Sequence, residues 1–176
     1  VGIRLCRMNT FFCDLLAILS RDPGGRGLMG FLPAPDLARA YEELARARRA
    51  LIITGFPIRT PDGRVCCETD GPVGAADMAY ALRDGGVECA VVTDAFNFGQ
   101  VRAAVDCRVP GVQTHLLEKD DPGAAKRLIE EFAPTHVFPL ERPGKAADGH
   151  YRNARGGVID DIVADTDLVY ALAREA

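Results

Sequence analysis

Four short apolar segments, separated by stretches of helical character, limit the fold more than any other feature of this chain. The segments are residues 50–54 (ALIIT), 89–93 (CAVVT), 112–116 (VQTHL) and 136–140 (HVFPL). Helices are predicted between them at residues 72–83, 98–106 and 122–132. Alternation of strand and helix with short connections is typical of right-handed βαβ units, which build a parallel sheet. We therefore predict an α/β protein with a three-layer α/β/α architecture and a mostly parallel, Rossmann-like sheet.

The remaining elements fit one α/β domain over residues 1–176. The run Ala90–Val92 is apolar without alternation, which indicates a strand buried on both faces. Pro139, near the end of the last strand, indicates either that this strand lies at the sheet edge or that the chain leaves the strand there. Two more helices are predicted before the first strand, at residues 10–20 and 37–49, and a last one after Asp165 or Thr166.

Composition and charge argue against several classes of protein. Hydrophobic residues make up 48% of the chain and the net charge is −4, so nothing indicates binding to nucleic acid or to an anionic membrane surface. No apolar run reaches transmembrane length. Asp14 interrupts the N-terminal apolar run, which has no small-residue cleavage site after it, so we interpret it as an amphipathic helix rather than a signal peptide. We expect a cytoplasmic protein.

The long Gly/Pro loop after the first strand places two carboxylates, Glu68 and Asp70, directly before the Gly71-Pro72 start of a helix. Ligands of open α/β sheets bind at the carboxyl ends of the strands. Carboxylates can hold a hard cation such as Mg²⁺ or Mn²⁺, and a helix N-terminus offers free N–H groups to an anion. The loop therefore predicts a site for a divalent metal and a small anionic molecule.

Polar residues also follow the other predicted strands, namely Thr54-Gly55, Thr93-Asp94 and Glu141-Arg142. Parallel strands end at the same edge of a sheet, so we expect these groups to converge with Glu68 and Asp70. The alternative is that each acid caps the following helix or lies solvated in a loop.

The segment 141–157 is rich in glycine and polar residues. Its plausible oxygen ligands are Glu141, Asp148 and Asn153, and its arginines are Arg142, Arg152 and Arg155. Arginine can clamp a carboxylate or phosphate in bidentate fashion. Tyr151 is a candidate for stacking or hydrogen bonding, and His150 for acid–base chemistry. The alternative is a surface loop with solvated charges.

Several motifs, in order along most of the chain, resemble the D-glutamate cyclase family. They are RDPGGRG at 21–27, TGFPI at 54–58, ETDGPVGA at 68–75, VVTD at 91–94 and ERPGKAADGHYRNARG at 141–156. The resemblance implies a three-layer α/β/α enzyme that converts D-glutamate to 5-oxo-D-proline with loss of water, using a divalent metal, Mn²⁺ or Mg²⁺. Members usually continue into a Gly/Asp/Asn-rich segment, so we expect the family domain to extend beyond Ala176.

For such a reaction we predict three groups of site residues. The metal ligands are Glu68, Asp70 and Glu141, and the metal would polarise the γ-carboxyl group as a Lewis acid. The candidates for the base that takes the ammonium proton are Asp94, Asp148 and His150. The substrate-binding residues are Thr54, Gly55, Gly71, Arg142, Tyr151, Asn153 and Arg155.

Two other interpretations remain open at this point. A metal-dependent phosphohydrolase would use acidic strand ends equally well. A truncated homologue without catalytic activity would bind an anionic metabolite or a partner chain. A homo-oligomer is compatible with each interpretation, since a second chain could complete the site.

Overall fold

The structure is a computed structural model that describes residues 2–25, 27, 31 and 34–176, with residues 2–9 described by their backbone. The chain divides into two compact units, Val1–Ala47 and Arg48–Ala176. The assignment of residues 1–176 to a single domain stays a prediction. Arg26, inside the RDPGGRG motif, lies outside the described residues. No helix in the described ranges is long and apolar enough to cross a membrane.

The first unit is a pair of helices, α1 (Gly2–Leu19) and α2 (Ala34–Leu44). Phe12 is 5% exposed, and its ring centroid lies 5.4 Å from that of Tyr41, so the two helices share an aromatic contact. The helix α1 begins earlier than the predicted residue 10. The helix α2 ends before the predicted residue 49, because Arg49 already belongs to the first strand.

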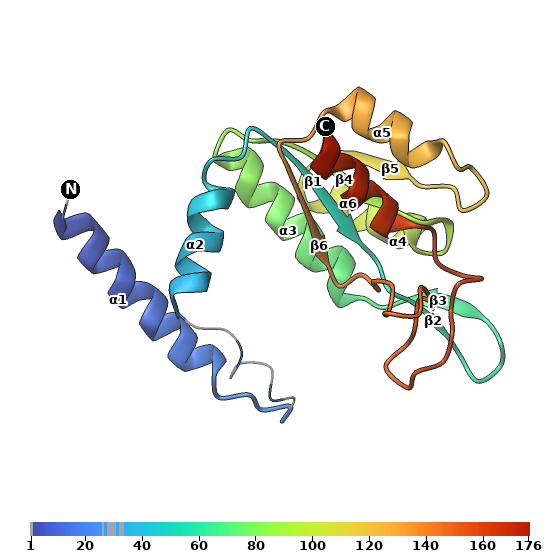
Figure 1. Ribbon diagram of the computed structural model, residues 1–176, viewed down its shortest axis with the longest axis horizontal. Coiled ribbons are helices and arrows are strands. Elements are labelled where there is room, and N and C mark those ends of the chain that lie inside the picture. Colours follow the sequence, from blue (N-terminus) through green and yellow to red (C-terminus); the bar gives the residue numbers. More distant parts are fainter. Residues whose placement is uncertain (1, 26, 28–30, 32–33) are drawn as a thin grey trace. The chain divides into compact units, whose positions relative to one another are not determined.

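The second unit is built on a sheet of four parallel strands (Figure 1). These are β1 (Arg49–Thr54), β4 (Glu88–Thr93), β5 (Gln113–Leu116) and β6 (His136–Leu140), in the order β5-β4-β1-β6. Ile52 in β1 pairs with Val91 in β4 and with Phe138 in β6. The predicted parallel sheet is confirmed, and so is the edge position of the strand that contains Pro139.

Helices cover both faces of this sheet, which confirms the three-layer α/β/α fold. Leu51 and Ile53 belong to one buried cluster with residues of α5 (Ala124–Phe132) and α6 (Thr166–Glu175). Alternate side chains of a strand point to opposite faces, so Ile52 faces α3 (Asp70–Asp84) and α4 (Ala95–Arg108). Small buried alanines on α3, such as Ala75 and Ala79, let that helix approach the strands closely.

A β-hairpin lies where the sequence predicts a loop between residues 55 and 71. Its strands are β2 (Pro57–Arg59) and β3 (Val65–Cys67), which pair antiparallel. Gly63, with φ of 83°, allows the tight turn, and the Thr60 N–H donates to the Arg64 carbonyl across it at 2.8 Å. The glycine and proline residues of this segment indicate a turn in the sequence, but they do not indicate the two short strands that flank it.

The strand order places a topological switch point between β1 and β6. From β1 the chain builds outward to β4 and β5, and it then returns to the other side of β1 with β6. Open α/β sheets bind ligands outside the carboxyl ends of the strands at such a point. The carboxyl ends of β1 and β6 are therefore where a functional site is expected.

Candidate metal and substrate site

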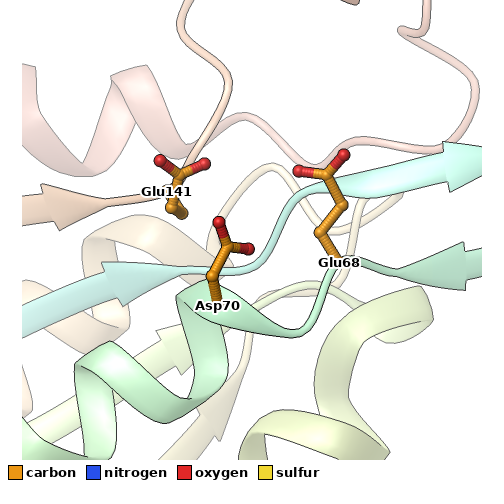
Figure 2. Close-up of side chains that lie close together, drawn as sticks. All are labelled: Glu68, Asp70 and Glu141. Atoms are coloured by element: carbon orange, nitrogen blue, oxygen red, sulfur yellow. The ribbon is translucent and has the colours of Figure 1, made fainter. Parts of the chain in front are cut away.

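Three carboxylates meet at the switch point. Glu68, Asp70 and Glu141 each place one carboxylate oxygen within 4.8 Å of the other two. Glu68 follows β3, Asp70 begins α3 and Glu141 follows β6, and Figure 2 shows their carboxylate groups pointing to the same side. Glu68 is partly exposed, whereas Asp70 and Glu141 are exposed. The structure thus brings the three predicted metal ligands together, and metal binding itself stays a prediction.

Glu141 reaches this cluster because the ends of β1 and β6 are joined and closely packed. The Thr54 hydroxyl donates to the Leu140 carbonyl at 2.7 Å, directly before Glu141. A Cβ at Gly71 would lie 3.0 Å from both the Glu141 Cβ and the Thr54 Oγ1, so glycine permits the start of α3 to approach Glu141. Thr54 and Gly71, predicted as substrate-binding residues, here position the acidic cluster.

Asp70 is the first residue of α3 rather than its N-cap. Thr69 occupies the N-cap position and makes no side-chain capping hydrogen bond. The Asp70 Oδ1 accepts from the Gly71 N–H at 3.1 Å, and an acid in the first turn also interacts favourably with the helix dipole. Asp70 therefore does not occupy the N-cap position that the alternative requires, and its carboxylate group lies within the cluster.

Asp94 and Arg142 form an ion pair that is almost inaccessible to solvent. The Arg142 Nη1 lies 2.6 Å from the Asp94 Oδ2, and the two side chains are 2% and 4% exposed. The other Asp94 oxygen accepts from the Asn97 amide at 2.7 Å. Asp94 as the base and Arg142 as the anion clamp stay predictions, but this pairing favours a positioning role for both. Sequence spacing could not reveal a pairing across 48 residues.

Gly55 lies where the end of β1 meets the end of β4. The Thr93 hydroxyl donates to the Thr54 carbonyl at 2.7 Å and ties the two strand ends together. Gly55 has φ of 98°, and a Cβ there would lie 2.7 Å from the Thr93 Oγ1 and from the Asn97 Cβ. Its carbonyl accepts from Arg142, so Gly55 contributes backbone to the site.

The polar loop after β6 is largely satisfied by its own hydrogen bonds. Asp148 pairs with Arg152, which also donates to the Gly156 carbonyl at 2.7 Å. The Asn153 Oδ1 accepts from the Arg155 and Gly157 N–H groups at 3.0 and 2.9 Å, so Asn153 shapes a turn. Hydrogen bonds from the Arg152 side chain and the His150 N–H lower the pKa of Asp148, which makes it a weak proton acceptor.

Tyr151 is buried beneath this loop, at 3% exposure, in a cluster with Ile159, Ile162 and Val163. Its hydroxyl donates to the Asp165 Oδ1 at 3.0 Å, and desolvation raises the pKa of Tyr151 well above its usual value. Tyr151 thus packs in an apolar cluster, which its place in a polar loop did not predict, and its role in substrate binding stays a prediction.

His150 retains a half-exposed side chain. Its Nδ1 lies 2.7 Å from the Asp160 Oδ2, while Nε2 has no partner among the described residues. The hydrogen bond from His150 is the largest cause of the lowered pKa of Asp160. Sequence analysis missed Asp160, because a spacing of ten residues corresponds to no short catalytic motif.

A cavity of about 510 Å³ lies at the other end of the second unit. Its lining residues come from the ends of α3 and α4 and the turn after α4: Tyr80, Arg83, Asp84, Arg108, Val109 and Pro110. None of the predicted site residues lines it. Arg108 stacks on the Tyr80 ring at 3.7 Å and donates to Asp77 at 2.6 Å, so its charge is already partnered.

Comparisons with known proteins show the family to which this chain belongs. A family model described as D-glutamate cyclase-like, C-terminal, matches residues 15–176, and the chain belongs to this family. The human protein described as mitochondrial D-glutamate cyclase is 33% identical over 178 aligned residues, which cover 92% of this chain and 28% of that relative. The chain therefore spans about 28% of the length of the curated relative it matches. The family resemblance is confirmed, and the cytoplasmic location stays a prediction.

Proposed function

We propose that this chain belongs to a metal-dependent lyase that converts D-glutamate to 5-oxo-D-proline and water. The observation that carries the proposal is the convergence of Glu68, Asp70 and Glu141 at the switch point of the sheet. Membership of the D-glutamate cyclase-like family supports the choice of substrate.

The donor set fits a hard divalent cation. All three side chains offer carboxylate oxygen, which Mg²⁺ and Mn²⁺ prefer over nitrogen or sulfur. Their partial exposure leaves room for water or substrate oxygen beside them. Glu68, Asp70 and Glu141 would hold the metal, which when bound would polarise the γ-carboxyl group of the substrate.

Ring closure forms a bond between the α-nitrogen and the carbon of the γ-carboxyl group. One oxygen of that carboxyl group leaves as water, with the two protons that the nitrogen gives up. The α-ammonium must first lose a proton. Of the three predicted bases, His150 has an acceptor atom without a partner among the described residues, because Asp160 contacts Nδ1 and leaves Nε2 available. A carboxylate beside Nδ1 favours the tautomer in which Nε2 accepts the proton. His150 is therefore the preferred base.

The α-carboxylate needs a positive partner. Arg142 is committed to Asp94, and Arg152 to Asp148. Arg155 is exposed, and its guanidinium group has no partner among the described residues. Arg155, together with the N–H groups at the start of α3, is the proposed binding site for the α-carboxylate. Holding both ends of glutamate in a ring-closing shape would supply the orientational part of catalysis.

The test combines turnover with metal binding. Proton NMR of D-glutamate with the protein and Mn²⁺ should show 5-oxoproline, whereas L-glutamate and a metal-free sample should not. In isothermal titration with MnCl₂, Glu68→Gln, Asp70→Asn and Glu141→Gln should bind Mn²⁺ much more weakly than Glu130→Gln, an exposed control on α5. Unchanged Mn²⁺ affinity in all three variants would refute the metal site.

The same experiment separates the other interpretations. Hydrolysis of a generic phosphate ester without turnover of D-glutamate would favour a phosphohydrolase. Binding of Mn²⁺ and D-glutamate without any turnover would favour a non-catalytic homologue.

A further inference from the structure

Arg142 joins three separate parts of the second unit. Its Nη1 donates to the Gly55 carbonyl at 3.0 Å, at the end of β1, and contacts Asp94 at the end of β4. Its Nη2 donates to the Ala164 carbonyl at 3.0 Å, and its Nε to the Thr166 hydroxyl at 3.1 Å, at the start of α6. All three guanidinium nitrogens are thus engaged by fixed groups.

Glu141, the residue directly before it, has an unusual backbone conformation. Its φ is 47°, which is in the left-handed region that side-chain-bearing residues rarely adopt. This conformation is strained for a residue with a side chain and persists when the surroundings enforce it. The restraint comes from both sides, because Thr54 holds the Leu140 carbonyl and the buried fork of Arg142 anchors the next residue.

We propose that Arg142 is a positioning residue that places the Glu141 carboxylate in the acidic cluster and couples this placement to the docking of α6. The inference rests on the proposed metal site. Coupling between two sites is reciprocal. Mn²⁺ at the acidic cluster should therefore stabilise the docked α6, and loss of the Arg142 contacts should weaken Mn²⁺ binding.

Arg142→Lys tests this coupling, since lysine keeps the charge but cannot reproduce the planar fork. Partners that orient metal ligands typically change metal affinity by about 10- to 100-fold when substituted, so we expect a loss in that range. Arg152→Lys is the matched control, because Arg152 lies in the same loop and pairs with Asp148 rather than with the ends of the strands. Its Mn²⁺ affinity should remain within about twofold of the unsubstituted protein, as expected of an exposed pair.

A double-mutant cycle distinguishes positioning from general loosening. Mn²⁺ affinity is measured by isothermal titration for the unsubstituted protein, Arg142→Lys, Glu141→Gln and the double variant. If Arg142 acts through Glu141, its substitution should weaken binding strongly in the unsubstituted background and hardly at all in Glu141→Gln. Equal weakening in both backgrounds would overturn the inference, because a merely structural role affects both alike.

Thr166→Val guards against a failure of Arg142→Lys to fold. Valine has a similar shape and removes the acceptor for the Arg142 Nε while leaving the ion pair with Asp94 intact. Thr166→Val should weaken Mn²⁺ binding less than Arg142→Lys does. Its effect, like that of Arg142→Lys, should be clear in the unsubstituted protein and nearly absent in Glu141→Gln. Hydrogen exchange of α6 amides should slow on addition of Mn²⁺ to the unsubstituted protein and respond less in Thr166→Val.

The outcomes separate this inference from the proposed function. Folded, unsubstituted protein that binds no Mn²⁺ would overturn both. Mn²⁺ binding that is lost in Glu68→Gln but unaffected by Arg142→Lys and Thr166→Val would overturn the coupling and leave the metal site in place.

Discussion

Gly55→Ala provides the sharpest test of how the ends of β1 and β4 are packed. An added Cβ would lie 2.7 Å from the Thr93 Oγ1 and the Asn97 Cβ, whereas unbonded carbon atoms normally stand about 3.5–4.0 Å apart. Both neighbours are fully buried, and Thr93 is also hydrogen-bonded to the Thr54 carbonyl, so neither can move freely. The alanine must therefore be accommodated by displacement of the backbone.

Two separate effects add up at this position. The φ of 98° is strained for any residue with a side chain, which costs about 1–3 kcal/mol. Overpacking against rigid neighbours adds about another 1–3 kcal/mol. Gly63→Ala isolates the first effect, because Gly63 has φ of 83° and a Cβ added there would meet nothing within 4 Å. Gly55→Ala should therefore destabilise by about 1–3 kcal/mol more than Gly63→Ala.

Urea denaturation followed by circular dichroism measures both free energies of unfolding, with the slope of the transition compared between variants. Hydrogen exchange of the β1 amides checks that the transition is that of the second unit. Equal losses in the two variants would refute the reasoning, since they would mean that the close contacts at Gly55 relax without cost.

Three further predictions concern stability and thiol reactivity. Asp165 caps α6, so Asp165→Ala should cost about 1 kcal/mol at pH 7 in urea denaturation. Burial tends to raise the pKa of Asp165, but hydrogen bonds, with that from Lys145 the largest, outweigh burial and lower the pKa below the ordinary 3.8. The stability that the charged Asp165 contributes is therefore present at neutral pH and is lost as the pH falls through the lowered pKa. If the difference in free energy of unfolding between Asp165→Ala and the unsubstituted protein stayed constant down to pH 2, this account would be contradicted. Ala133 ends α5 with φ of 44°, so Ala133→Gly should raise the free energy of unfolding by about 1 kcal/mol, and a loss of stability would count against the strain argument. Burial raises the pKa of Cys89 to about 11, so iodoacetamide at pH 8 should modify the exposed Cys107 much faster than Cys89. Peptide mass spectrometry measures both rates of modification, and equal rates would show that Cys89 is accessible.

The parallel sheet was predictable because apolar runs and turn residues carry its pattern directly. The run Ala90–Val92 is buried on both faces, as its lack of alternation indicated. The β2–β3 hairpin was not predictable in the same way, because each strand has three residues and the periodicity of so short a segment is ambiguous.

The convergence of Glu68 and Asp70 with Glu141 was also predictable, because parallel strands end at one edge of a sheet. The burial of Arg142 was not, since a charged residue in a Gly-rich loop gives no sign of a partner 48 residues earlier. Tyr151 illustrates the same limit, because its burial depends on apolar residues after the loop, Ile159, Ile162 and Val163. Contacts between distant segments thus decide which polar residues remain free for chemistry.

The position of Glu141 in the acidic cluster depends on the register in which β6 pairs with β1. Glu141 directly follows β6, while Asp70 belongs to a helix whose start packs against the end of β1. A shift of β6 by two residues would keep every side chain on its own face but move Glu141 by roughly 6.6 Å, at about 3.3 Å per residue. That displacement exceeds the 4.8 Å within which the three carboxylates now lie. An ion held by all three would therefore select one alignment of the two strands, and ion binding could serve as a readout of correctly assembled protein.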